Sequence, residues 1–208
     1  TNEDRREFYN RSVAYSTEFW RAGRNIAGIQ QFTGLSYSKP GSTGATSDVL
    51  MPDIATPKVW DSIQARLKDS FNRLGIGIKL YDVETGPGES YSFPVSVYND
   101  LNEDVNDLPV TLKVTAGGRV LHSETKVYNV SEATAKGADG TSPDTMVQEF
   151  SYTMPENGIP EGTEVKVTAS YSRNGETVSS IREMTWNQTP KLKLKATAGS
   201  SQNGQGPE

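Results

Sequence analysis

The first third of the chain has apolar residues at every third or fourth position in two segments, the spacing of amphipathic helices. In residues 3–22 this spacing forms a stripe of Phe8, Ser12, Tyr15, Phe19 and Ala22, flanked by Trp20. In residues 57–74 it forms an apolar face of Val59, Trp60, Ile63, Leu67, Phe71 and Leu74. Thr56 as N-cap, Pro57 in the first turn and Gly75 after the last turn favour the ends of the second helix. We therefore expect two amphipathic helices, whose apolar sides stay exposed unless an upstream part of the chain or a second copy covers them.

Between these helices, residues 26–33 form a short run rich in Ile and Phe, which predicts a buried strand. Residues 39–56 contain two prolines and two glycines, which predicts a surface loop. A single strand cannot satisfy its own backbone hydrogen-bonding groups. We therefore expect residues 1–76 to be the end of a larger α/β region whose other strands precede it.

From residue 76 onward, apolar and polar residues alternate, which is the period of strands. Turn residues separate seven strand candidates: 76–82, 89–98, 109–116, 119–128, 146–154, 163–172 and 176–186. Gly117-Gly118 and Asn174-Gly175 predict two-residue hairpin turns. Ile181 is out of phase with its apolar neighbours in the last strand, which predicts a bulge or a twisted edge there. Seven short antiparallel strands over residues 77–190 predict an all-β, immunoglobulin-like sandwich.

Composition and charge narrow the possible partners. Residues 1–76 hold 10 Lys and Arg against 8 Asp and Glu, whereas residues 77–208 hold 11 against 18. An acidic second half has no basic stripe for phosphate contacts, so we expect no nucleic-acid partner. No apolar stretch approaches about 18 residues, so we expect no membrane partner. Residues 191–208 have little to bury and predict a flexible tail.

The residues FWRAGRNIAGIQQFTGLSYS (19–38) and PKVWDSIQARLKDSFNRLGI (57–76), followed by a sandwich, resemble family 2 glycoside hydrolases, the β-galactosidase-like group. The resemblance implies that residues 1–76 are the C-terminal end of a (β/α)8 TIM barrel. Helix 3–22, strand 26–33 and helix 57–74 would be its last unit, and residues 77–190 an accessory domain. It also implies export to the periplasm or the extracellular space, because such enzymes are often exported in polysaccharide-degrading bacteria.

In that family the acid/base and nucleophile glutamates follow the fourth and seventh barrel strands. The resemblance places both strands before residue 1, so we expect no catalytic residue on this chain and no activity from it alone. Glu3, Glu7 and Glu18 lie on the predicted first helix, and none of them inherits a catalytic role. A retaining mechanism needs two carboxyl groups about 5–5.5 Å apart, and the chain offers no such pair.

The resemblance places Gln31 and Phe32 near the carboxyl end of the last barrel strand, where barrel enzymes have their active sites. A Gln amide both donates to and accepts from sugar hydroxyls, and an aromatic ring stacks on the apolar face of a pyranose. Gln31, Phe32 and Tyr37 are therefore the candidate substrate-binding residues. The alternative is a structural strand whose glutamines bind neighbouring backbone groups.

Other residues with chemical potential have simpler interpretations. The acidic loop 100–107 lacks the Gly and terminal Glu of a helix-loop-helix calcium site, which favours a solvated loop. The chain has one histidine, His122, and no cysteine, so it offers no thiolate or multi-histidine metal site. We expect no metal and no cofactor. Trp20, Trp60 and Trp186 are more typical of core residues than of sugar platforms.

Three functions remain open from the sequence. The first is the C-terminal part of a glycoside hydrolase, which would act on an oligo- or polysaccharide only together with the N-terminal part of its barrel. The second is a non-catalytic carbohydrate- or protein-binding sandwich with an N-terminal extension. The third is an adhesin-like or structural sandwich without a ligand.

Overall fold

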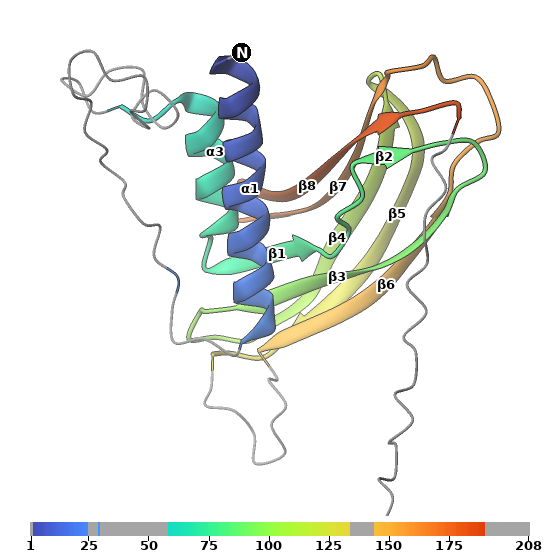
Figure 1. Ribbon diagram of the computed structural model, residues 1–208. Helices are drawn as coiled ribbons and strands as arrows, with labels where there is room; N and C mark the ends of the chain where they lie inside the picture. Colours follow the sequence, from blue (N-terminus) through green and yellow to red (C-terminus); the bar gives the residue numbers. More distant parts are fainter. Residues whose placement is uncertain (1, 25–28, 30–57, 134–143, 190–208) are drawn as a thin grey trace, which may run out of the picture.

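The computed structural model describes residues 2–24, 29, 58–133 and 144–189, and it shows a two-sheet β-sandwich with two helices along one side (Figure 1). The helices are α1 (Asn2–Gly23) and α3 (Asp61–Ser70). The strands are β1 (Leu74–Ile78), β2 (Glu84–Thr85), β3 (Ser90–Asn99), β4 (Val105–Ala116), β5 (Arg119–Val130), β6 (Thr145–Thr153), β7 (Glu164–Arg173) and β8 (Glu176–Trp186). In the part of the chain described, neither helix is long and apolar enough to cross a membrane.

The strands form a three-stranded sheet in the order β1-β3-β6 and a five-stranded sheet in the order β2-β8-β7-β4-β5. Alternate residues of both sheets point inward and form one apolar core, as the period of two predicts. The largest fully buried members of this core are Trp186, Tyr128, Phe150, Ile76, Ile78 and Leu112. The β-sandwich expected from the sequence is therefore present, and it holds without disulfides because the chain has no cysteine.

The two predicted hairpin turns are confirmed. Gly117 and Gly118 connect β4 to β5 with φ of 54° and 83°, and Asn174 and Gly175 connect β7 to β8 with φ of 53° and 78°. The bulge predicted near Ile181 is wrong, because the β7–β8 ladder runs without a register shift from Glu164 to Arg173. The irregularities lie in the β4–β5 pairing instead. The short strand β2 pairs in parallel with β8 and had no counterpart in the prediction.

Strand β1 is buried on both faces, because it lies between the sandwich core and the helices. Its sequence Leu-Gly-Ile-Gly-Ile alternates large residues with glycines. Leu74, Ile76 and Ile78 belong to the sandwich core. A Cβ at Gly75 would lie 1.8 Å from Tyr98 Cε2, and one at Gly77 would lie 3.3 Å from Glu18 Cβ. Gly75 therefore makes room for the Tyr98 ring, and Gly77 makes room for Glu18 of α1 on the outer face of the sheet.

The helix expected over residues 57–74 is shorter, because α3 begins at Asp61 after Trp60 as N-cap and ends at Ser70. Leu74 fits the helical stripe and also starts β1, where it joins the sandwich core. The side-chain Oδ1 of Asn72 accepts a hydrogen bond from the backbone N of Leu74, at 3.1 Å, in the turn between the two elements. The predicted domain boundary between residues 76 and 77 falls inside β1.

Helix α1 covers the predicted first helix, and the side that meets the sandwich lies opposite to most of the predicted apolar stripe. Its buried residues are Asn10, Val13, Ala14, Thr17 and Glu18. Within the stripe, Phe8 is 74% and Phe19 46% exposed, whereas Tyr15 reaches Glu183 of β8. Trp20, expected in the core, is 52% exposed. The face that meets the sandwich is thus made of small and polar side chains, and the face that meets solvent carries aromatic rings.

Candidate functional site

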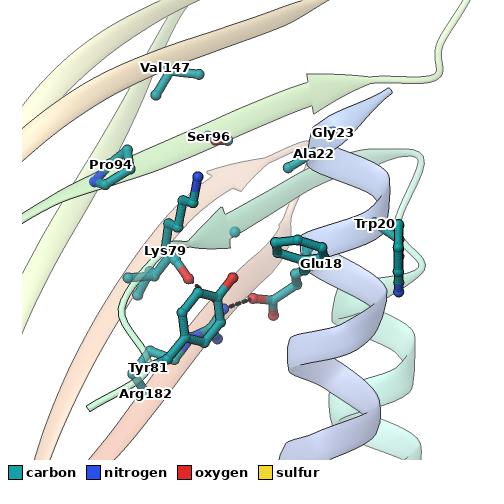
Figure 2. A pocket seen from close by; sticks show the side chains of 13 residues that line it. Glu18, Trp20, Ala22, Gly23, Lys79, Tyr81, Pro94, Ser96, Val147 and Arg182 are labelled. Atoms are coloured by element: carbon teal, nitrogen blue, oxygen red, sulfur yellow. Dashed lines mark hydrogen bonds and ion pairs between the residues drawn. The ribbon is translucent and has the colours of Figure 1, made fainter. Parts of the chain in front are cut away.

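A groove of about 350 Å³ lies between the C-terminal half of α1 and the sandwich (Figure 2). Glu18, Phe19, Ala22 and Gly23 contribute its helical side. The sandwich side comes from β1, from the segment that follows β1, from β3 and β6, and from Arg182 of β8. The groove exists because the glycines of β1 allow the helix to lie close to the sheet at its floor.

The floor of the groove is a buried ion pair between α1 and β8. Arg182 Nη2 donates to Glu18 Oε2 at 2.7 Å and to the backbone oxygen of Ile78 at 2.5 Å. Ser180 Oγ donates to the same Glu18 Oε2 at 2.7 Å. The Arg182 guanidinium also lies 4.0 Å from the centre of the Tyr15 ring. Both charged side chains are almost fully buried, so each depends on its partner to offset the loss of hydration.

Burial strongly affects the titration of these groups. Desolvation raises the pKa of Glu18, and the charge of Arg182 and the hydrogen bond from Ser180 offset only part of that rise. Desolvation likewise raises the pKa of Tyr81, whose ring lies above the ion pair. The Tyr81 hydroxyl is therefore protonated and able to donate a hydrogen bond at neutral pH.

A second ionic cluster joins both helices to β8. Glu183 accepts a hydrogen bond from the Tyr15 hydroxyl at 2.5 Å and forms an ion pair with Arg66 of α3. Arg11 Nε of α1 lies 3.8 Å from the same carboxylate. One buried carboxylate on the sandwich thus binds residues from α1 and α3 together.

A third cluster holds the C-terminal end of α1. Arg21 and Arg24 donate to the two oxygens of Asp100, at 2.6 and 2.5 Å, in the loop after β3. Arg24 also pairs with Asp144 at 2.8 Å. The hydrogen bonds and charges of the two arginines lower the pKa of Asp100 although burial opposes this. Arg21 lies over the ring of Tyr98, 4.7 Å from its centre, which places the helix end on the outer face of the sheet.

Aromatic rings line the open side of the groove. Phe19 contacts Trp20 at a centroid distance of 5.2 Å and Tyr81 at 6.4 Å, with interplanar angles of 82° and 69°. These steep angles leave the ring faces open rather than stacked on one another. Tyr81 is 48% exposed. In Figure 2, Tyr81 and Lys79 stand opposite α1, while Trp20 lies on the other side of the helix.

The sequence candidates for sugar binding, Gln31, Phe32 and Tyr37, lie outside the described residues, as does the predicted strand 26–33. The tail predicted over residues 191–208 lies outside them too. Glu7, dismissed as a catalytic residue, pairs with Arg11 at 2.8 Å on the surface of α1. These observations leave the predicted sugar-binding residues untested.

The remaining candidates have structural surroundings. Residues of the acidic loop engage cations and backbone: Asp100 binds Arg21 and Arg24, and Glu103 pairs with Arg173 at 2.8 Å. In the described ranges, no three His, Cys, Asp or Glu side chains come close enough to hold a metal ion. His122 stacks on Tyr152 across the open edge of the sandwich, with centroids 4.9 Å apart. Trp186 is buried in the core as expected.

The residues at the groove floor were not predicted from the sequence, because what marks them is only that polar side chains occupy inward positions of a strand. Val178, Ser180, Arg182, Met184 and Trp186 alternate along β8 and are all buried. Ser180 and Arg182 are thus polar residues at inward positions, which calls for buried partners. The second signal is the pair of glycines in β1, which marks a close approach of another element. Neither signal names Glu18 as the partner.

Comparisons with known proteins do not show which family this chain belongs to. No family model matches the chain, and no curated protein matches it. Among solved structures, the CARDB domain of the PF1109 protein from Pyrococcus furiosus matches 56% of this chain and 94% of its own, with 17% identity and a TM-score of 0.35. A β-glucuronidase from Bacteroides uniformis matches 53% of this chain and 13% of its own, with 13% identity and a TM-score of 0.38. Likeness this low bears on neither family nor function.

Proposed function

We propose that this chain is the C-terminal part of a family 2, β-galactosidase-like glycoside hydrolase. In this proposal α1 and α3 are the outer helices on either side of the last barrel strand, residues 26–33, and the sandwich is an accessory domain. The carboxylates that cleave the glycosidic bond belong to the part of the enzyme before residue 1. The substrate is an oligo- or polysaccharide, and the complete enzyme is exported.

The outward apolar stripe of α1 is the observation that carries this proposal. Phe8 faces away from the sandwich, and Phe19, three turns later on the same side of the helix, is 46% exposed with the Tyr81 ring at a centroid distance of 6.4 Å. Exposing large aromatic rings in a row is unfavourable in water, by roughly 1.5–3 kcal/mol for each ring that could be buried. An outer barrel helix must present such a stripe to the barrel strands, which would cover it.

The connection of the elements supports the same proposal. Helix α1, the segment 25–60 and helix α3 lead directly into β1, so the sandwich follows the second helix without a linker. The Glu183 and Asp100 clusters fix α1 and α3 to the sandwich through their polar sides. Those sides are thus occupied, and the aromatic side is left for the barrel.

The test compares this chain with the longer polypeptide that the proposal implies. We expect nitrophenyl glycosides to be hydrolysed by the longer protein and not by residues 1–208 alone. Replacing Phe8 and Phe19 by Asp should cost the longer protein most of its activity, because the helix no longer packs on the barrel. The same double variant of residues 1–208 should keep its free energy of unfolding within about 0.5 kcal/mol, because both rings are exposed here.

Two results would contradict the proposal. One is hydrolysis by residues 1–208 alone, which would mean that the catalytic carboxylates are on this chain. The other is full activity of the longer F8D/F19D protein, which would mean that the stripe does not meet the barrel. The matched control is Val83→Asp, a substitution at an equally exposed apolar residue of the sandwich side, which should leave activity unchanged.

A further inference from the structure

The groove between α1 and the sandwich combines a buried carboxylate, a free cation and open aromatic rings. Glu18, Lys79 and Tyr81 belong neither to the outward side of α1 nor to the sandwich core, and Phe19 lies where the outward side of α1 meets the rim of the groove. Ligand sites in proteins usually pair apolar walls with a few placed polar groups in a cavity of about 300–1,000 Å³. At about 350 Å³ the groove has room for a small ligand.

Glu18 offers a hydrogen-bond acceptor at the floor. Both hydrogen bonds that its side chain receives, from Ser180 and Arg182, end on Oε2. Oε1 takes part in neither of them. The side chain is only 4% exposed, so its position is fixed by the surrounding protein and not by solvent. A carboxylate held in this way can accept a second donor from a ligand at little entropic cost.

Lys79 offers a donor opposite Glu18. Its side chain is exposed at the rim and forms no ion pair with any described residue. Figure 2 shows it reaching along the groove beside Tyr81, across from Ala22 and Gly23 of α1. Ser96 adds a hydroxyl group to the same side. The groove thus presents donors on the sheet side and an acceptor on the helix side.

Tyr81 and Phe19 supply the apolar surface. Their rings are about half exposed and meet at a steep angle, so a flat apolar ligand face can lie on Tyr81 with its edge toward Phe19. The Tyr81 hydroxyl is protonated and adds a further donor. A ligand for this groove therefore has one flat C–H face and several hydroxyl groups that both donate and accept.

The charge of the groove decides between ligand classes. Arg182 is neutralised by Glu18, which leaves Lys79 as the one unpaired charge among the described lining residues. An anionic group at the floor would face Glu18 Oε1 with acceptors only, whereas a hydroxyl group can donate a hydrogen bond to it. A purely apolar ligand would leave Glu18 Oε1 and Lys79 without partners. A neutral polyhydroxy ring satisfies all of these groups.

We propose that the groove lined by Glu18, Phe19, Lys79 and Tyr81 binds a neutral pyranose sugar. The sugar lies with its C–H face on Tyr81, donates a hydroxyl to Glu18 and accepts from Lys79. This site needs residues of α1 as well as of the sandwich, so residues 77–190 alone do not contain it. It is a binding site without bond cleavage, and it does not depend on whether the chain belongs to a glycoside hydrolase.

The experiment measures sugar binding to residues 1–208 by saturation-transfer NMR and calorimetry. The probes are lactose, cellobiose and xylobiose, with sodium glucuronate as the charged comparison. We expect at least one neutral disaccharide to bind with a dissociation constant below about 10 mM, a weak affinity typical of a shallow site. Tyr81→Ala should weaken that binding about tenfold, and Lys79→Met about threefold.

The matched control is Phe8→Ala, which removes an exposed ring of the same helix outside the groove and should leave binding unchanged. All of these positions are exposed, so the variants should fold, and circular dichroism verifies it. Absence of binding by all three disaccharides overturns the proposal. So does binding that Tyr81→Ala leaves intact, or binding of glucuronate alone. Activity of the longer enzyme is a separate measurement, so either proposal can fail without the other.

Discussion

The sandwich and the helical layer formed by α1 and α3 distribute their side chains in opposite ways. The sandwich buries an unbroken apolar core between its sheets. Helix α1 turns small and charged side chains toward the sandwich and leaves Phe8 and Phe19 outside. A helix in a complete globular protein normally does the reverse. The contrast shows that the sandwich has a closed apolar core, whereas α1 exposes two large aromatic rings on its outer side.

The two regions are also held together differently. Within the sandwich, burial of apolar area supplies the stability. Between the regions, three ionic clusters centred on Glu18, Glu183 and Asp100 make the connection, together with the close approach at Gly75 and Gly77. Buried ion pairs add little net stability but are costly to break, so they favour one geometry of the helices over others. The junction is thus specific and sensitive to single substitutions.

The largest effect should follow from breaking the buried pair. Arg182→Met leaves the Glu18 carboxylate buried without a cation, which should cost about 3–5 kcal/mol of unfolding free energy. Urea denaturation measures the loss. Adding Glu18→Met should recover most of it, because both charges are then absent. The control is Arg173→Met at an exposed pair with Glu103, which should cost less than about 1 kcal/mol. Equal losses for Arg173→Met and Arg182→Met would contradict this view of the junction.

The next-largest effect tests the close packing at the glycines of β1, separately from the ion pairs. Gly75→Ala places a methyl group 1.8 Å from Tyr98 Cε2, where it overlaps the ring of a fully buried side chain. Because Arg21 lies over this ring, either the sheet or the C-terminal end of α1 must move. We expect a loss of about 2–3 kcal/mol. Gly77→Ala is the matched comparison, since its methyl group would lie 3.3 Å from Glu18 Cβ and needs only a small shift. Its loss should be about 1 kcal/mol or less. The reverse order of the two variants would show that the Tyr98 ring, over which Arg21 lies, does not need the space at Gly75.

These contacts also show how far the sequence predicts this molecule. The period of two identified the long strands and both hairpins, because in a sandwich each strand has one inward and one outward side. The same kind of reasoning identified the apolar stripe of α1 but not the side that meets the sandwich, because that side is made of small and polar residues. It also extended the second helix to Leu74, because Leu74 fits both the helical and the strand pattern.

The groove could not be predicted from the sequence, for a different reason. Ser180 and Arg182 lie at inward positions of β8, which indicates a buried polar cluster. Their partner Glu18 is more than 160 residues away, as its hydrogen bonds to them show. Only the three-dimensional arrangement brings β8, β1 and α1 to one point. Tyr81 and Lys79 lie within the predicted strand 76–82, in the phase opposite to Ile78 and Leu80, and that phase marks them only as outward residues.

The smallest effect tests the ionic attachment at the end of α1 and depends on pH. The pKa of Asp100 is lowered in the folded chain, because Arg21 and Arg24 outweigh the effect of burial. A lowered pKa contributes stability above the unfolded value near 3.9, and that contribution is lost as the pH falls through the folded value. Asp100→Asn should therefore cost about 1 kcal/mol at neutral pH, a modest figure because the carboxylate is partly exposed.

The difference between wild type and Asp100→Asn should shrink as the pH falls below about 4, because protonated Asp100 no longer attracts the two arginines. Urea denaturation at neutral pH and near pH 3 measures both values. Asp107→Asn is the control, since the Asp107 side chain forms no ion pair among the described residues, and it should change stability at neither pH. A pH-independent deficit for Asp100→Asn would mean that hydrogen bonding of a neutral side chain, and not charge, holds the end of the helix. The helical layer would then be attached to the sandwich by shape rather than by ions, and the contrast between the two regions would rest on Gly75 and the buried pair alone.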